Sequence, residues 1–231
     1  MLVRKVGGEG SLTAQAYDFL REDIVTCRLK PDERLRLEEL RERYGVGSGS
    51  LREALMRLEA EGLVLLEPNK GFRVLPISRE HLLDVMRARA EMDALCLKWS
   101  LQDGGVEWES ALVGALHRLK RFSKKSSTSQ ASHDDWHTAH HAFHFALISG
   151  CNSAIFRSFH SALSDHVERY VAISVSIDDF PRDDISEHEE IVGAILDHDS
   201  EAAVGLLRAH LMKTSDKLVA TLFGGQSVAA A

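Results

Sequence analysis

Residues 51–74 read LREALMRLEAEGLVLLEPNKGFRV, and this stretch decides the fold of the first part of the chain. From Leu51, apolar residues recur at i, i+3, i+4 and i+7, which predicts an amphipathic helix that packs through one face. We expect Gly62 to end this helix. Apolar runs on both sides of Pro-Asn-Lys-Gly at residues 68–71 predict a β-hairpin. A helix that leads directly into a hairpin is typical of a winged DNA-binding domain.

Two more apolar patterns precede this stretch. The segment SLTAQAYDFLREDIVTCRL, residues 11–29, has near-helical spacing and is followed by the breaker Pro31-Asp32. The segment LRLEELRERYGV, residues 35–46, predicts a second short helix, and Gly45 falls where a tight turn between helices needs a small residue. Three helices and a hairpin make a winged helix-turn-helix, which we place at residues 11–78, after an N-terminal tail at residues 1–10.

From residue 79 onward the apolar pattern is helical to the end of the chain. The segments with helical spacing are separated by Gly104-Gly105, by the polar run SSTSQAS at residues 126–132, and by a turn around Pro181. The sequence therefore predicts a mainly α-helical protein, in which residues 79–231 form an all-α ligand-binding and dimerisation bundle of about six helices.

Composition and charge limit the possible functions. A chain of 231 residues fits two modest domains, and its formal net charge of −7 argues against a protein that simply coats nucleic acid. The acidity lies in residues 79–231, whereas residues 11–78 are nearly neutral and can still bind a phosphate backbone through one basic face. Three well-separated cysteines, no apolar run near the roughly 18 residues of a membrane helix, and no signal-like N-terminus predict a cytoplasmic protein without a membrane partner.

The expected recognition helix begins with an unusual turn. In a helix-turn-helix the first turn of the second helix reaches base edges in the major groove. Here that turn is Gly47-Ser48-Gly49-Ser50, whose serines can form hydrogen bonds and whose glycines allow close backbone approach. Arg52 is the first side chain able to form two hydrogen bonds with guanine. A salt bridge from Arg52 to Glu53 or Glu59 is the alternative.

The tip of the hairpin offers a second set of contacts. Lys70 and Gly71 can reach the minor groove or the DNA backbone, and Asn69 can do so unless it is only a solvated turn residue. The candidate DNA contacts are Arg36, Ser48, Gly49, Ser50, Arg52, Lys70 and Gly71.

Histidine is abundant, with 12 residues, and four of them fall on one predicted helix. His140 and His144 are spaced i, i+4, so adjacent turns present two imidazoles that can bind one ion. His137 falls on the same face and His141 to one side. A histidine pair on a helix is also common as surface or core decoration, which is the alternative to metal binding.

Two further histidines lie beside the apolar stripes of later helices, His188 in SEHEEIV and His210 in LLRAHL. Each can point into the bundle, where an unpaired imidazole is costly. Inward histidines from three helices can instead converge on a metal ion, since bundles build metal sites in this way.

The first part of the chain resembles the winged-helix domain of GntR-type bacterial transcription regulators. The match runs through PDERLRLEELRERYGVGSGSLREAL and includes Arg-Glu-Ala-Leu at residues 52–55 and Glu-Gly-Leu at residues 61–63. Two departures matter. Many members have Ser-Arg-Thr-Pro where this chain has Gly-Ser-Gly-Ser at residues 47–50, and some have an arginine at the position of Glu38. The resemblance therefore implies DNA binding but carries over no operator preference.

The segments HHAFHFALISGCNS, SEHEEIVGAI and LLRAHL resemble the all-helical domain of the FadR-like (FCD) branch of that family, over most of residues 79–222. In many members an Asp or Asn and three His bind a divalent metal beside a small carboxylate effector. The resemblance assigns the three histidines to His144, His188 and His210, and places His140 where the Asp or Asn usually stands. A four-His site favours Zn²⁺ or Ni²⁺ over Mn²⁺; alternatively His140 does not ligate, and water or effector takes its place.

A carboxylate effector needs a cation partner, and Arg87, Arg89 and Arg169 lie on predicted bundle helices. Each of them can equally be an ordinary surface or interhelix charge. The main hypothesis is a homodimeric, non-enzymatic regulator that binds a palindromic operator and responds to a small acid. The rivals are a direct metal sensor and a metal-dependent all-α hydrolase that uses His133-Asp134 or His198-Asp199.

Overall fold

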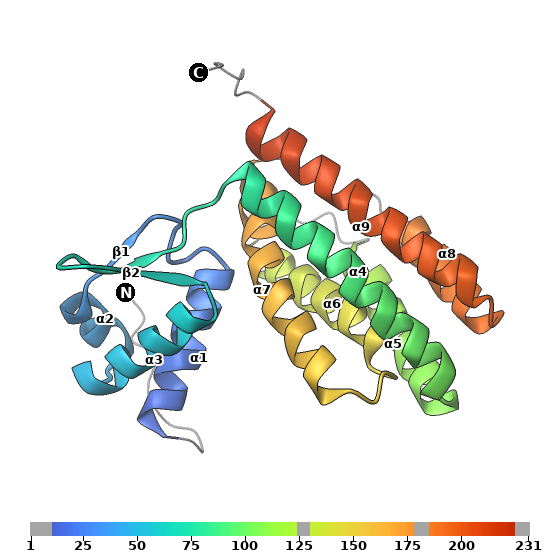
Figure 1. Ribbon diagram of the computed structural model, residues 1–231, viewed down its shortest axis with the longest axis horizontal. Helices are drawn as coiled ribbons and strands as arrows, with labels where there is room; N and C mark the ends of the chain where they lie inside the picture. Colours follow the sequence, from blue (N-terminus) through green and yellow to red (C-terminus); the bar gives the residue numbers. More distant parts are fainter. Residues whose placement is uncertain (1–10, 124–129, 178–184, 225–231) are drawn as a thin grey trace. The chain divides into compact units, whose positions relative to one another are not determined.

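The computed structural model describes residues 11–123, 130–177 and 185–224, and it is mainly helical (Figure 1). The chain divides into two compact units at Leu82, with the stretch Asp165–Ile177 of a later helix belonging to the first unit. The predicted fold class is confirmed: a winged helix-turn-helix is followed by six helices. The helices and strands are α1 (Leu12–Val25), β1 (Arg34–Leu35), α2 (Leu37–Tyr44), α3 (Ser48–Ala60), β2 (Val64–Glu67), β3 (Gly71–Val74), α4 (Arg79–Asp103), α5 (Val106–Ser123), α6 (Gln130–Ile148), α7 (Ala154–Ile177), α8 (Ile185–Leu196) and α9 (Ser200–Phe223).

The helices of the winged domain begin and end for local reasons. The Ser11 side chain accepts a hydrogen bond of 3.2 Å from the Ala14 backbone N–H and so caps α1. Gly45 ends α2 with a φ of 68°, in the left-handed region that glycine adopts without steric cost. α3 packs on α1 and α2 through the predicted stripe, because Leu51, Ala54, Leu55 and Leu58 are fully buried.

The sheet has one strand more than the sequence predicted. β3 pairs with β2 to form the expected hairpin, and on its other side with β1, so the strand order is β1-β3-β2 and both pairings are antiparallel. The segment expected to be helical from residue 35 therefore begins as strand, with Leu35 paired to Phe72 and both side chains buried. A two-residue strand has no periodicity of its own, so only its partner reveals it.

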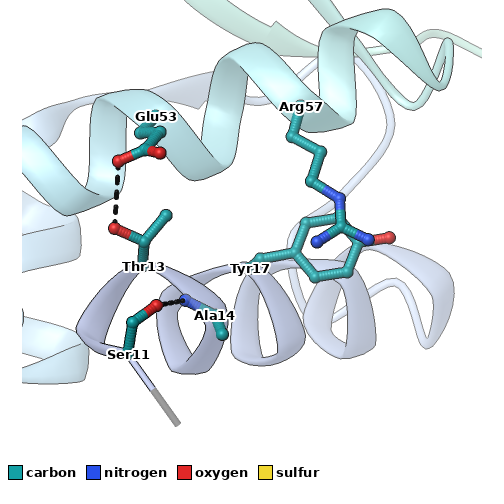
Figure 2. Close-up of a pocket in the computed structure, with 6 residues that line it drawn as sticks. All are labelled: Ser11, Thr13, Ala14, Tyr17, Glu53 and Arg57. Carbon is teal, nitrogen blue, oxygen red and sulfur yellow. Dashed lines mark hydrogen bonds between the residues drawn. The ribbon is translucent and has the colours of Figure 1, made fainter.

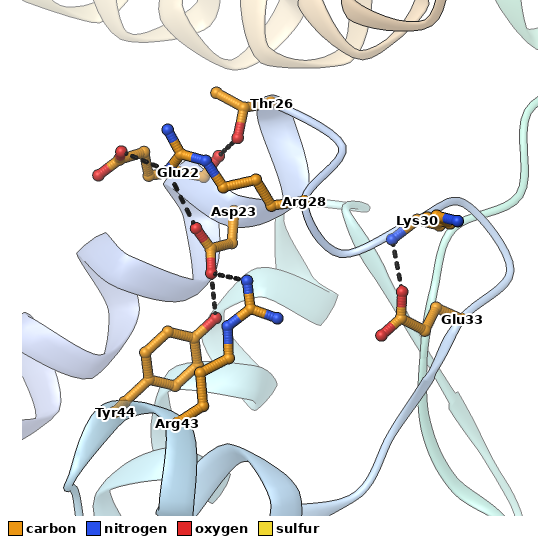
Figure 3. Close-up of polar contacts among 8 residues, drawn as sticks. All are labelled: Glu22, Asp23, Thr26, Arg28, Lys30, Glu33, Arg43 and Tyr44. Atoms are coloured by element: carbon orange, nitrogen blue, oxygen red, sulfur yellow. Dashed lines mark hydrogen bonds and ion pairs between the residues drawn. The ribbon is translucent and has the colours of Figure 1, made fainter. Parts of the chain in front are cut away.

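One buried carboxylate ties the winged domain together (Figure 3). Asp23 on α1 is 3% exposed, and it accepts hydrogen bonds from the Tyr44 hydroxyl at 2.6 Å and from Arg28 at 3.2 Å. The Arg43 guanidinium forms an ion pair with the same carboxylate at 2.6 Å. The charge of Asp23 is therefore neutralised and its oxygens are hydrogen-bonded inside the domain.

The second unit is a bundle in which α5 packs against α6 and α8, and α8 against α9. α4 ends before Gly104-Gly105, where the turn into α5 lies close to the Trp108 ring. The Trp108 indole N–H donates a hydrogen bond of 2.9 Å to the Ala146 carbonyl and so joins α5 to α6. This packing places α6, α8 and α9, the three helices that carry the candidate metal ligands, around one core.

Candidate functional site

The start of α3 is open to solvent. Gly47 precedes the first turn, Gly47 and Gly49 are exposed, and a side chain at either position would meet no other atom within 4 Å. Ser48 and Ser50 are half-buried at the same turn. Packing within the protein therefore does not require small residues here. Because the residues are small, the backbone of this turn stays accessible.

Two arginines on α3 differ sharply in their surroundings. Arg52 is exposed and forms no ion pair within the described part of the chain, so the alternative salt bridge to Glu53 or Glu59 is not formed. Arg57 is occupied: its guanidinium lies 3.7 Å from the centre of the Tyr17 ring and pairs with Glu61 at 3.3 Å. Arg52 is thus the side chain of α3 with a free guanidinium.

Glu53 and Arg57 also line a hollow between α1 and α3 (Figure 2). Its volume is about 460 Å³, and the Thr13 hydroxyl donates a hydrogen bond of 3.1 Å to Glu53 across it. The Tyr17 hydroxyl donates to Glu61 at 2.7 Å. These contacts hold the charged side chains of this face of α3 against α1.

The remaining predicted DNA contacts lie outside α3. Lys70 and Gly71 are exposed at the tip of the β2–β3 hairpin, where Asn69 and Gly71 both have positive φ angles. Arg36 is exposed directly before α2 and pairs with Glu39 at 3.0 Å. A surface pair of this kind is weak, so Arg36 can exchange Glu39 for another anion at little cost.

Four buried imidazoles meet in the core of the bundle. The ligand nitrogens of His140, His144 and His188 all lie within 4.8 Å of one another. The Nε2 atoms of His140 and His144 are 3.2 Å apart, and His210 joins through an Nε2–Nε2 distance of 3.2 Å to His188. The four side chains come from α6, α8 and α9, and none is more than 7% exposed. The convergence that the sequence predicted is present.

The orientation of His210 is set by a carboxylate. Glu187 accepts a hydrogen bond of 2.9 Å from Nδ1 of His210, which places the proton on Nδ1 and leaves a lone pair on Nε2. Lys213 pairs with the other oxygen of Glu187 at 3.3 Å. A carboxylate behind the second nitrogen is the usual support of a metal-bound histidine. No sequence pattern indicated Glu187, although its position next to His188 was a possible signal.

The donor set fits a divalent ion. Two nitrogens bound to one tetrahedral Zn²⁺ at about 2.0–2.1 Å lie about 3.3 Å apart, close to the 3.2 Å seen twice here. Burial, followed by the nearby His140 and Arg89, lowers the pKa of His144 well below its ordinary value, so its imidazole is neutral. The Nδ1 of His144 is buried with no hydrogen-bond partner among the described residues. A neutral ring with its Nε2 turned inward is the form that ligates a metal.

The three candidate effector arginines do not share one environment. Arg89 on α4 is 3% exposed and lies near enough to His144 to affect its pKa. Arg87 is exposed on the same helix. Arg169 is fully buried in the part of α7 that belongs to the first unit, where it donates to the Leu75 carbonyl. Of the three, Arg89 is the buried arginine whose charge acts on one of the four histidines, His144.

Comparison with known proteins agrees with both halves of the structure. Residues 12–74 match the profile of "Bacterial regulatory proteins, gntR family", and residues 84–213 match that of the "FCD domain". The chain is 36% identical over 200 residues to the HTH-type transcriptional repressor GlaR of Escherichia coli, covering 85% of this chain and 90% of GlaR.

The chain belongs to the GntR family, in its FCD branch. It is also 34% identical over 202 residues to the uncharacterised HTH-type transcriptional regulator BphR of Paraburkholderia xenovorans, covering 87% of this chain and 82% of BphR. The structure of E. coli McbR/YncC shares the fold, with a TM-score of 0.78 at 20% identity over 90% of this chain and 97% of McbR.

This GntR-family protein is accordingly a transcription regulator with a helix-turn-helix that binds operator DNA and an FCD effector-binding domain, and it is not an enzyme. The His-Asp pairs of the hydrolase alternative fit that conclusion. His198 is exposed, and Asp199 accepts a hydrogen bond of 3.0 Å from the Ala202 backbone, which caps α9. His133 and Asp134 have side chains outside the described residues. No described helix is both long and apolar enough to cross a membrane.

Proposed function

We propose that this protein is a homodimeric, cytoplasmic regulator whose FCD domain binds Zn²⁺ and a small carboxylic acid, and whose operator affinity depends on that acid. The observation that carries the proposal is the grouping of four buried imidazoles, whose Nε2 atoms form two close pairs. Four neutral nitrogens favour Zn²⁺, with Ni²⁺ as the second choice, over the harder Mn²⁺.

The metal site would consist of His144, His188 and His210, with His140 as the fourth nitrogen in place of the oxygen ligand seen in many relatives. Without an ion, one ring of each close pair can donate an Nε2–H to the other. Zinc binding replaces these protons, so affinity should fall as pH falls. When bound, the ion would supply a Lewis-acid position for a carboxylate oxygen.

Arg89 is the proposed cation for the acid, because it is buried and its charge acts on His144. Arg pairs with carboxylates through two parallel hydrogen bonds, which fixes the orientation of a small acid. The acid changes operator affinity only if it binds the DNA-competent and DNA-incompetent states differently.

On the DNA, the free guanidinium of Arg52 is the proposed base contact. Arg52 lies one turn into α3, in the part of the recognition helix that enters the major groove. Ser48, Ser50 and the backbone at Gly49 would contact base or phosphate, and Arg36, Lys70 and Gly71 the flanking backbone or minor groove. A two-fold dimer would bind half-sites one helical turn apart or a multiple of it.

The test begins with zinc binding by purified protein, measured by competition with a fluorescent chelator. We expect one tightly bound Zn²⁺ per chain and strong loss of affinity in His144→Ala and His188→Ala. The matched control is His141→Ala, since His141 sits on α6 outside the three-imidazole group. Equal zinc affinity in all four proteins would contradict the metal site.

The second arm measures binding to an operator selected in vitro, using metal-free protein, zinc-loaded protein, and zinc-loaded protein with acetate or succinate. A change that requires the acid supports acid control. A change caused by zinc alone would identify a direct metal sensor instead.

A further inference from the structure

A buried network of polar side chains joins α4 to α7, and none of its members belongs to the group of four histidines. Nε of Arg89 donates to Asp93 at 3.2 Å, and the other Asp93 oxygen lies 2.6 Å from Nδ1 of His160 on α7. Nε2 of His160 lies 3.3 Å from the Ser164 hydroxyl. All four residues are at most 3% exposed, in a core where polar groups need partners.

One assignment of protons satisfies the donors and acceptors of this network. The Asp93 carboxylate accepts from Arg89 Nε–H and from His160 Nδ1–H, which selects the imidazole tautomer with a lone pair on Nε2. The Ser164 hydroxyl then donates to that nitrogen. Asp93 and His160 are therefore satisfied inside the protein, and α4 and α7 both hold the carboxylate in place.

The terminal nitrogens of the Arg89 guanidinium do not take part in this network. Its Nη1 and Nη2 atoms form no hydrogen bond within the described residues, and they are not among the buried polar atoms sealed from solvent. Asp93 engages the Nε edge of the guanidinium, so the two Nη atoms remain available to an incoming group. Two adjacent N–H donors with no protein acceptor match a carboxylate.

We propose that Asp93 and His160 are positioning residues for the acid site: through the Nε edge they hold the Arg89 guanidinium so that its Nη atoms face the carboxylate of the effector. This inference rests on the proposed function, because it assumes that Arg89 binds the acid. It adds a supporting layer that no ligand motif in the sequence indicated. An arginine side chain loses less conformational entropy on binding when its orientation is already set.

The experiment titrates acetate and succinate into zinc-loaded full-length protein by calorimetry. Asp93→Asn keeps the shape of the side chain but removes the charge that orients Arg89, and we expect it to weaken acid binding about tenfold or more, the loss of one charge-assisted hydrogen bond. His160→Gln should weaken binding by a smaller factor. In an Arg89→Met background, adding Asp93→Asn should cause no further loss. The matched control is Glu91→Gln, an exposed carboxylate on the same helix that pairs with Arg208.

Zinc affinity and operator affinity without acid are measured on the same proteins and should not change, because a merely structural defect would alter them. Acid affinity in Asp93→Asn equal to that of the wild type overturns the positioning role alone. Additive losses in the double variant overturn it too. If the wild type binds zinc but neither acid, both this inference and the acid part of the proposed function fail, while the metal site stands.

Discussion

The winged domain and the bundle each bury a cluster of polar side chains, and the two clusters are built in opposite ways. In the winged domain, donors of Arg28, Arg43 and Tyr44 surround the single carboxylate of Asp23 (Figure 3). Each charge there faces its opposite, and the cluster is complete without any added group. It joins the end of α1 to the end of α2.

In the bundle, four buried histidines lie together, and their Nε2 atoms face each other in two pairs, His140 with His144 and His188 with His210. Among the described residues, no carboxylate belongs to the histidine group, and Glu187 contacts Nδ1 of His210, on the other side of its ring from Nε2. A cluster of lone-pair nitrogens is suited to a metal ion, which accepts those lone pairs. The difference separates a polar cluster that is complete within the fold from one that we propose binds a ligand.

Removing Asp23 should have the largest effect on stability. Asp23→Ala leaves the Tyr44 hydroxyl and two guanidinium groups without their acceptor, and we expect the free energy of unfolding to fall by about 3 kcal/mol. Urea denaturation measures this. Glu22→Ala removes the exposed partner of the same Arg28 and should cost less than about 0.5 kcal/mol. Similar losses of unfolding free energy in the two variants would show that the buried contacts of Asp23 do not stabilise the domain.

Zinc should stabilise the bundle by a nearly equal amount. At a free concentration of 100 times Kd, binding to the folded state alone contributes about 2.7 kcal/mol. Thermal unfolding with and without Zn²⁺ measures the shift, and a chelator should reverse it. His188→Ala should abolish the shift, whereas the exposed His198→Ala should retain it. Retention in both variants would place the ion elsewhere.

The two arginines of α3 extend the comparison to DNA binding. Arg52→Ala should weaken operator binding by about 1–3 kcal/mol, roughly fivefold to 150-fold, because a free guanidinium is lost from the recognition helix. Ser48→Ala should weaken it far less. Arg57→Ala is the matched control, since Arg57 is held by Tyr17 and Glu61. Fluorescence anisotropy with labelled operator decides, and equal, small losses from Arg52 and Ser48 would mean that other residues read the bases.

The smallest effect concerns the contact that holds Arg57. Burial and the hydrogen bond to Glu61 raise the pKa of Tyr17 to about 12. The unfolded phenol has a pKa of about 10, so the folded state holds the proton more tightly. The stabilisation from Tyr17 is therefore complete below about pH 10 and is lost as pH rises through about 12. Unfolding measured from pH 9 to 12 should show a steeper decline for the wild type than for Tyr17→Phe, and parallel curves would refute this.

Local patterns predicted much of this architecture. The stripe from Leu51 to Leu58 predicted α3, and the turn residues at 68–71 predicted the hairpin, because periodicity and turn chemistry are written in adjacent residues. The i, i+4 spacing of His140 and His144 likewise predicted that both imidazoles lie on one face of their helix. Strand β1 escaped prediction, since its two residues are strand only through pairing with β3.

The supporting residues of the bundle could not be found in this way. Asp93 and His160 are 67 positions apart, and no spacing rule links them. Arg87 and Arg89 are two positions apart on one helix, yet one is exposed and the other buried, because burial depends on which face of α4 meets the other helices. The sequence by itself determined which helices and strands form, because their signals are local. Only the tertiary structure decided which polar side chains share a buried site, because that depends on how distant helices pack.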